Sequence, residues 1–238
     1  MCYGGVESDV YTFGTAINAF CKGGKVGDAA CLFLKMEEMG IAPSVITYNT
    51  LIDGYFRSGD SIEPYMLKNK MIKNGLIPSV VTYSILINGL VKLGKFDDAD
   101  CVLKEMLDKG IVPNVVIYNT LIDAYCKVGE IGNASRMRDY MVSKGVIPNS
   151  VTYNSLVQRF CKAEHHSEAM DIWFRLLEKG FAANMITSNA LIHRLCESGN
   201  RPEAFRILKV GWTLQCMFSF AAFLVTCSSS VVRGSAVQ

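Results

Sequence analysis

Cysteine is the residue type in this chain that most readily suggests chemistry, because nine thiols could bind a metal or form disulfides. Their spacing argues against both uses. No Cys-x-x-Cys pair is present, and four of the cysteines share one register of a 35-residue period, at Cys21, Cys126, Cys161 and Cys196. Phe56 and Val91 fill this register in two further blocks, which marks it as an apolar packing position. We therefore predict buried, reduced thiols without a metal, including Cys31 and Cys101 in a second shared register, and a reducing intracellular compartment.

The three histidines form no recognisable site. His165 and His166 are neighbours, so on a helix they point in different directions, and we expect them to be solvated without a partner at helical spacing. His193 lies alone in another block, and we expect no ligand role for it. No Ser-His-Asp order, paired-carboxylate motif or phosphate-binding loop is recognisable. We predict no enzymatic activity, no cofactor, no metal and no small-molecule substrate.

Basic side chains recur with the same 35-residue period, which suggests contacts with phosphate groups. They are Lys22, Arg57, Lys92, Lys127 and Lys162. Periodic cations would line one face of a regular structure, although a cation at the end of a helix also interacts favourably with the helix dipole. The net charge of +2 is too small for nonspecific binding to duplex phosphates. Any interaction with nucleic acid must therefore depend on residues placed one by one.

The elements that would position these residues are predicted by a strict internal repeat. Glycines recur every 35 residues from Gly40 to Gly180, prolines follow three residues later, and a tyrosine stands five residues after each proline, as in Pro43 and Tyr48. A period in this range indicates stacked units. Within each unit, two amphipathic stretches are separated by glycine and closed by glycine and proline, which predicts a helix–turn–helix. We predict an all-α fold, a right-handed α-solenoid of 35-residue helix–turn–helix repeats.

The period divides the chain into blocks. The predicted organisation is the tail of a preceding repeat at 1–9, complete repeats at 10–44, 45–79, 80–114, 115–149 and 150–184, a partial repeat at 185–210, and a non-repeat tail at 211–238. The tetratricopeptide repeat is an alternative helix pair, but its period is about 34 and its Trp and Leu-Gly signature is missing. Armadillo-type repeats are longer.

Three segments resemble the pentatricopeptide repeat: VITYNTLIDGYFRSG (45–59), VVIYNTLIDAYCKVG (115–129) and KEMLDKGIVPN (104–114). The resemblance covers roughly residues 1–210, and the constant repeat length resembles the P subclass of the family. It implies a plant-type organellar protein that binds single-stranded RNA and acts in RNA processing, stabilisation or translation. It also implies a chloroplast or a mitochondrion, although we expect no transit peptide in the first residues of this chain.

The family reads one base per repeat with the fifth and the last residue of each unit. The resemblance therefore implies five base-reading places, formed by Asn49 with Ser79, Ser84 with Asn114, Asn119 with Asn149, Asn154 with Asn184, and Asn189 in the partial repeat. Gly14 has no side chain to read with. Ser and Asn at the last place can donate to the ring nitrogen of cytosine or adenine, whereas an ionised Asp could only accept. The implied RNA core is C-A-C/U-C/U, read from 5′ to 3′.

The resemblance also implies that the second residue of each unit wedges against a base. These residues are Tyr11, Ile46, Val81, Val116, Val151 and Ile186. Each feature has a structural alternative, because a repeated Asn could cap a helix and the apolar residues could belong to the core. Two other interpretations stay open for the whole chain, a protein-binding α-helical scaffold and a truncated gene-model fragment without function.

Several residues depart from the repeat pattern. Glu164 replaces the glycine that ends the first helix, Ala183 replaces the proline, and Ser188 replaces the tyrosine. Pro64 takes an alanine place and is expected in the first turn of its helix. Glu197 interrupts the series of cations. The uncharged run Leu214–Cys227 is shorter than the roughly 20 residues that span a bilayer, so we predict no membrane span.

Overall fold

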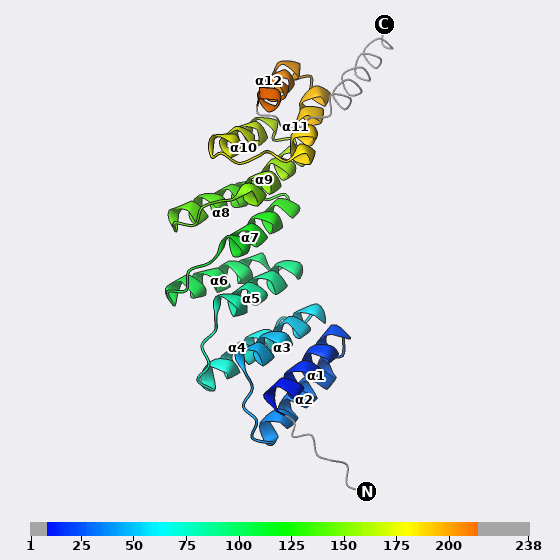
Figure 1. The fold of residues 1–238 in the computed structure, drawn as a ribbon, viewed down its shortest axis with the longest axis vertical. Helices are drawn as coiled ribbons and strands as arrows, with labels where there is room; N and C mark the ends of the chain where they lie inside the picture. Colours follow the sequence, from blue (N-terminus) through cyan, green and yellow to red (C-terminus); the bar gives the residue numbers. More distant parts are fainter. Residues whose placement is uncertain (1–8, 214–238) are drawn as a thin grey trace. The chain divides into compact units, whose positions relative to one another are not determined.

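The computed structural model describes residues 9–213 of the 238-residue chain, and the side chains of residues 9–210. Every regular element in this range is an α-helix, and the helices follow one another as six pairs, one pair for each repeat (Figure 1). The first helices of the repeats are α1 (Val10–Lys22), α3 (Val45–Arg57), α5 (Val80–Lys92), α7 (Val115–Lys127), α9 (Ser150–Lys162) and α11 (Met185–Glu197). The second helices are α2 (Val26–Glu38), α4 (Glu63–Lys73), α6 (Phe96–Asp108), α8 (Ile131–Ser143), α10 (His166–Glu178) and α12 (Arg201–Thr213). The predicted all-α repeat fold is confirmed.

Local sequence signals explain where these helices begin and end. A polar residue precedes most first helices and caps them, as Ser44 does when its Oγ accepts a hydrogen bond from the backbone N–H of Thr47 at 3.2 Å. The turn between the two helices of repeat two needs a positive φ, and Gly59 adopts 88° there without the steric cost that a Cβ would bring. The short second helix α4 begins only at Glu63, because Pro64 lacks a backbone N–H and is tolerated only in a first turn.

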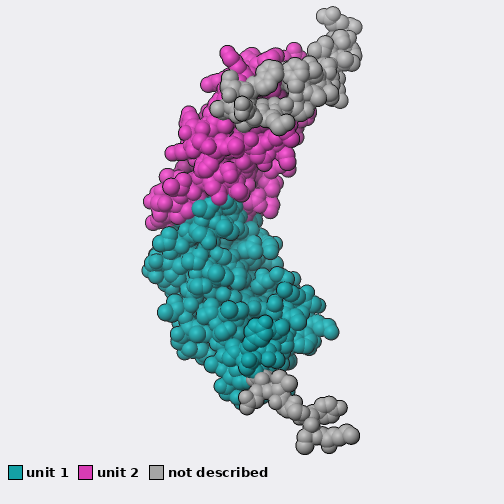
Figure 2. Space-filling view, viewed as in Figure 1, with its two compact units in different colours: residues 1–121 teal, residues 122–238 magenta. Residues whose placement is uncertain are grey.

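The chain divides into two compact units, residues 1–121 and residues 122–238, and the division falls within α7 (Figure 2). In the first unit α1 packs against α2 and α3, α3 packs against α4 and α5, and α5 packs against α6. In the second unit α9 packs against α10 and α11, and α11 packs against α12. In each unit, therefore, a first helix contacts its own second helix and the first helix of the next repeat.

The core contains a tyrosine at the same register of four repeats, at Tyr48, Tyr83, Tyr118 and Tyr153. The ring of Tyr48 meets Phe33 from the second helix of the preceding repeat edge-on, with ring centroids 5.1 Å apart. Repeat six has Ser188 in the tyrosine place. There the buried Trp173, also from the preceding second helix, supplies the missing aromatic volume and donates from Nε1 to Ser188 Oγ at 2.9 Å.

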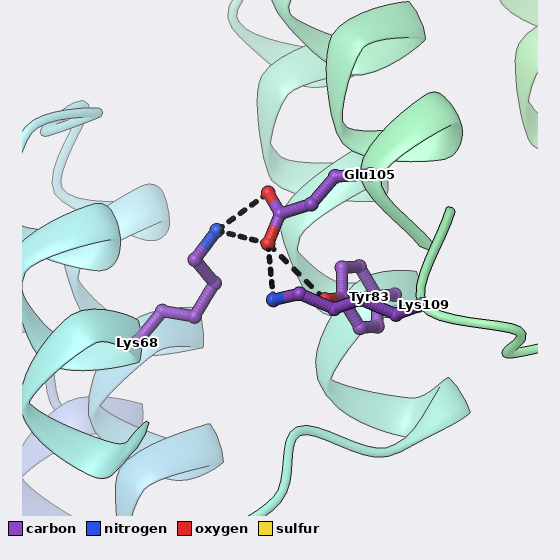
Figure 3. A network of polar contacts seen from close by, with 4 residues as sticks. All are labelled: Lys68, Tyr83, Glu105 and Lys109. Carbon is purple, nitrogen blue, oxygen red and sulfur yellow. Dashed lines mark hydrogen bonds and ion pairs between the residues drawn. The ribbon is translucent and has the colours of Figure 1, made fainter. Parts of the chain in front are cut away.

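A polar network replaces this aromatic contact between repeats two and three (Figure 3). Lys68 has the register of Phe33 and Trp173, yet it is only 5% exposed. Its Nζ donates to both carboxylate oxygens of Glu105, at 2.8 and 2.7 Å. Lys109 Nζ and Tyr83 OH donate to the same carboxylate, at 2.8 and 3.2 Å. The buried charge of Lys68 is thus compensated by a carboxylate whose own hydrogen-bonding capacity is filled.

The predicted tail run Leu214–Cys227 lies outside the described residues. Among the helices of residues 9–213, none combines the length and apolar character needed to cross a bilayer.

Candidate nucleic-acid interface

The second residues of the first helices are exposed apolar side chains. Their exposed fractions are 81% for Tyr11, 76% for Ile46, 58% for Val81, 64% for Val116, 57% for Val151 and 68% for Ile186. A position that serves only the core would not display branched aliphatic side chains to this extent. The structure therefore excludes the core alternative for these six residues, and it leaves them available to pack against a ligand.

The last residues of the repeats are N-caps of the next first helix. The side-chain Oδ1 atoms of Asn114, Asn149 and Asn184 each accept a hydrogen bond from the backbone N–H three residues later, at 3.1 Å. Ser44 caps α3 in the same way. At the start of α5 the backbone N–H of Ser79 donates to Thr82 Oγ1 at 3.2 Å. Capping therefore does operate at this place, and it sets the orientation of each asparagine amide. Because the oxygen faces the helix end, the NH₂ group is the part of the amide that points away from that end.

The fifth residues lie one turn into the first helices, and their side chains have different partners. Asn49 is 8% exposed, and its Oδ1 is buried without a hydrogen-bond partner. Ser84 Oγ donates to the carbonyl oxygen of Val80 at 2.8 Å, which leaves the hydroxyl oxygen as an acceptor. Asn119, Asn154 and Asn189 are half-buried. Asn154 Oδ1 accepts from the backbone N–H of Asn184 at 3.4 Å, so the fifth and last places of repeat five lie side by side.

A pocket of about 380 Å³ opens on the first helices of the N-terminal unit. Asn49 lines it, and so do Ile46 from α3 and Val81 from α5, the exposed second residues of two successive repeats. Lys22, Asp53 and Arg57 contribute the charged side chains of its lining. A space lined by apolar side chains and by the amide of Asn49 suits a flat heteroaromatic ring.

The five periodic cations are all exposed at the ends of first helices. Two of them form ion pairs with a carboxylate four residues earlier: Arg57 with Asp53 at 2.8 Å, and Lys127 with Asp123 at 2.6 Å. Asp123 also contacts Arg159 from the next repeat at 3.2 Å. Sequence reasoning missed Asp53, Asp123 and Arg159. The spacing of four residues was a readable signal for the first two, whereas the Arg159 contact spans two repeats and depends on their packing.

The prediction that all six of the described cysteines are buried is correct for four of them and wrong for two. Burial is confirmed for Cys21, Cys126, Cys161 and Cys196, whereas Cys31 and Cys101 are exposed. The last two lie on the second helices α2 and α6, outside the packing register. Burial raises the pKa of Cys126 to about 11 and that of Cys161 to about 12, so neither thiol ionises readily near neutral pH.

The prediction that His165 and His166 are solvated and lack a partner at helical spacing is also wrong in part. His165 has a partner at helical spacing, because its Nδ1 lies 3.3 Å from Oε1 of Glu168. His166 is half-buried and not fully solvated. Among the described residues, no group of three histidine, cysteine or acidic side chains is placed to hold a metal ion.

A larger pocket of about 710 Å³ lies between the second helices α2 and α4. Phe33, Leu34 and Met66 line it together with Lys70 and Lys73. Its lining comes mainly from the second helices, so it is separate from the polar and apolar residues that recur on the first helices.

Paired helices that repeat with one register, and that display the same positions from each first helix, define an α-helical repeat protein. The PPR repeat family matches the sequence in five overlapping windows, at residues 8–57, 43–92, 78–116, 113–162 and 148–197. The chain belongs to this family.

Known relatives agree with this assignment. A chloroplastic pentatricopeptide repeat-containing protein of Arabidopsis thaliana is 74% identical over 34 residues, which is 14% of this chain and 4% of that protein. The crystal structure of PPR10 from maize is 26% identical and matches 98% of this chain and 40% of its own, with a TM-score of 0.71. PPR10 in complex with an 18-nt psaJ RNA element matches 86% of this chain and 30% of its own, with a TM-score of 0.65 and 25% identity. This chain thus spans well under half the length of these relatives.

A fourth comparison concerns the fold alone. The PPR domain of Arabidopsis thaliana protein-only RNase P 1, solved in complex with tRNA, is 18% identical. It matches 76% of this chain and 95% of its own, with a TM-score of 0.60.

Proposed function

We propose that this chain binds single-stranded RNA in a sequence-specific manner, with one base read by each repeat on the first helices. The observation that carries the proposal is that Asn49, whose Oδ1 has no hydrogen-bond partner, lines the same pocket as Ile46 and Val81. A buried acceptor without a partner costs about 1–3 kcal/mol. A nucleobase would offer apolar faces to the two aliphatic side chains and a donor to the amide oxygen, which would offset this cost.

Cytosine fits the residues of repeat two. Its exocyclic amino group donates and its adjacent ring nitrogen accepts. Asn49 supplies the acceptor, and the hydroxyl group of Ser79 can supply the donor. The exposed Ser79 precedes Val81 of the pocket by two residues.

Repeat three combines a different pair and fits adenine. The hydroxyl proton of Ser84 is committed to the carbonyl of Val80, so its oxygen can accept from the amino group of adenine. The oxygen of the Asn114 amide is committed to the backbone N–H of Ile117, so its NH₂ group can donate to the ring nitrogen. The pairs Asn119–Asn149 and Asn154–Asn184 favour cytosine and tolerate uracil, which extends the proposed core to C-A-C/U-C/U.

The relatives support the ligand class and suggest the cellular setting. PPR10 is known in complex with an RNA element. The Arabidopsis relative is chloroplastic. We therefore propose a role in the processing, stabilisation or translation of organellar RNA, with the chloroplast as the favoured compartment and the mitochondrion as the alternative.

The test is a selection of bound sequences from a random single-stranded RNA pool, followed by competition with the duplex of the selected RNA. We expect enrichment of the C-A-C/U-C/U core and stronger binding to the single strand, since a duplex hides the base edges that these side chains must reach. Asn49→Leu is the matched variant, because it keeps the size of the side chain and removes the unsatisfied oxygen. It should relax the choice of the first core base without lowering thermal stability. Equal affinity for strand and duplex, or a pool without enrichment, would contradict the proposal.

A further inference from the structure

The five cations of the first helices are equivalent in register but not in charge environment. Asp53 lies 2.8 Å from Arg57, and Asp123 lies 2.6 Å from Lys127. The residues four places before Lys22, Lys92 and Lys162 are the uncharged Asn18, Asn88 and Gln158. In the described part of the chain, none of these three lysines forms an ion pair. Cations with and without a carboxylate therefore alternate along the repeats.

Asp53 and Asp123 neutralise different numbers of positive charges. In repeat two the charges of Asp53 and Arg57 cancel, so a phosphate that approaches this place meets a neutral pair. In repeat four Asp123 is shared between Lys127 and Arg159, and the three side chains together carry one positive charge. The Lys127 side chain is 60% exposed and that of Arg159 is 24% exposed, so Lys127 is the cation of this trio that solvent and ligands reach more freely.

We propose that Asp53 and Asp123 determine where the RNA backbone is held, an inference that rests on the proposed RNA binding. Lys22, Lys92 and Lys162 contact phosphates fully. Arg57 is neutralised by Asp53 and contributes little to phosphate binding. Lys127 contributes an intermediate amount to it. Repeats one, three and five would thus hold the RNA backbone more strongly than repeats two and four. A carboxylate in contact with a cation already takes the place of the counterion that a phosphate would otherwise displace, which is why the pairing should lower the salt dependence of binding.

The experiment measures the affinity of the whole chain for a labelled single-stranded RNA with the core C-A-C-C, as a function of salt. Each phosphate contact on a single strand adds about −0.7 to the slope of log K against log salt. Asp53→Asn keeps the shape of the side chain and frees Arg57. It should steepen the slope by about 0.7, which is about 2.6-fold more loss of affinity between about 50 and 200 mM salt. Asp123→Asn frees two cations and should steepen the slope at least as much.

Two controls isolate the effect. Asp139→Asn changes the net charge equally and also breaks an ion pair, with Arg138 at 2.7 Å, but on the second helix α8. It should leave the slope nearly unchanged. Arg57→Ala should change the salt slope of the wild-type chain little and should abolish the gain in slope in the Asp53→Asn background. Lys92→Ala should flatten the wild-type slope by about 0.7.

The outcomes separate this inference from the proposed function. If the wild-type chain binds the RNA but Asp53→Asn leaves the slope unchanged, the inference is overturned and the RNA-binding function stands. The same holds if Arg57→Ala flattens the wild-type slope as much as Lys92→Ala does. If the wild-type chain does not bind single-stranded RNA, the inference and the proposed function fail together.

Discussion

In repeat five, Oδ1 of Asn154 accepts a hydrogen bond from the backbone N–H of Asn184 at 3.4 Å, although the two residues are separated by the whole second helix α10. Asn184 in turn caps α11 through its own Oδ1, which accepts from Thr187 N–H at 3.1 Å. The first turn of one first helix therefore meets the cap of the next. This relationship places the two side chains of the proposed base-reading pair of repeat five side by side.

The base read by repeat three should change when Asn114 becomes Asp. The substitution replaces the outward NH₂ donor by an obligate acceptor, so the preference should move from adenine toward guanine, which offers an imino hydrogen. A mismatch of this kind costs about 1–3 kcal/mol. Affinities for RNAs that differ only at this base would measure the change.

Measurements of stability would distinguish a base-reading role of Asn114 from its role as a helix cap. Aspartate is as good an N-cap as asparagine, so Asn114→Asp should fold normally, whereas Asn114→Ala should lose about 1 kcal/mol of stability. If Asn114→Asp kept the adenine preference of the wild-type chain, Asn114 would only cap α7.

The network in Figure 3 should make stability depend on acid pH. Burial disfavours the ionised form of Glu105, but hydrogen bonds from Lys109 and Lys68 outweigh it and hold the pKa of this carboxyl below its usual value. A carboxylate whose pKa is lower in the folded chain stabilises fully above its unfolded pKa, and this contribution declines as pH falls below about 4.3. Urea unfolding followed by circular dichroism at several pH values should show the decline, and Glu105→Gln should remove it.

The carboxylate of Glu105 should be needed for the stability of the chain because the charge of Lys68 is buried. Glu105→Gln leaves the ammonium group without its counter-charge, and we expect a loss of about 2–3 kcal/mol. Lys68→Met restores an apolar residue in the register that holds Phe33 in repeat one, so it should recover much of the loss when it is combined with Glu105→Gln. If the single variant Glu105→Gln were as stable as the wild type, the network would contribute nothing.

Close packing between α3 and α5 should depend on Gly89. A Cβ at this residue would lie 2.2 Å from Cγ of the Phe56 ring, so Gly89→Ala forces the buried ring to move. Overpacking of this kind costs about 1–3 kcal/mol. Phe56→Val removes the ring and matches Val91 in the next repeat, so the double variant should be more stable than Gly89→Ala alone. Additive losses in thermal unfolding would contradict the contact.

Replacing Glu164 in the turn of repeat five by glycine should stabilise the chain. Glu164 has a φ of 63° in the place where the other repeats use glycine, and a Cβ in this left-handed region costs about 1–2 kcal/mol. Glu164→Gly should therefore raise the unfolding temperature. Gly129→Glu introduces the same strain in repeat four and should lower it by a similar amount. A stabilising effect of Gly129→Glu would show that φ is not the cause.

Much of the fold could be predicted from the sequence, because the signals that define it are local. Caps such as Ser44, the proline that follows four of the second helices and the turn glycines determine where helices begin and end within a few residues of chain. The two apolar registers that contain Tyr48 and Cys21 indicate burial because they repeat, and one helix pair cannot bury its apolar side alone. Cys31 and Cys101 fall outside these registers, and for them the prediction of burial was wrong.

The tertiary structure decided which side chains meet across repeats. Lys68 reads as a surface residue in the sequence, and only the packing of α4 beside α6 brings Glu105 to it. The unpartnered oxygen of Asn49, the contact of Asn154 with Asn184, and the sharing of Asp123 by Lys127 and Arg159 have the same origin. A sequence period establishes which positions are equivalent. The distances between positions in neighbouring repeats depend on how closely the helices pack, and hydrogen bonds and ion pairs are decided by differences of an ångström or less.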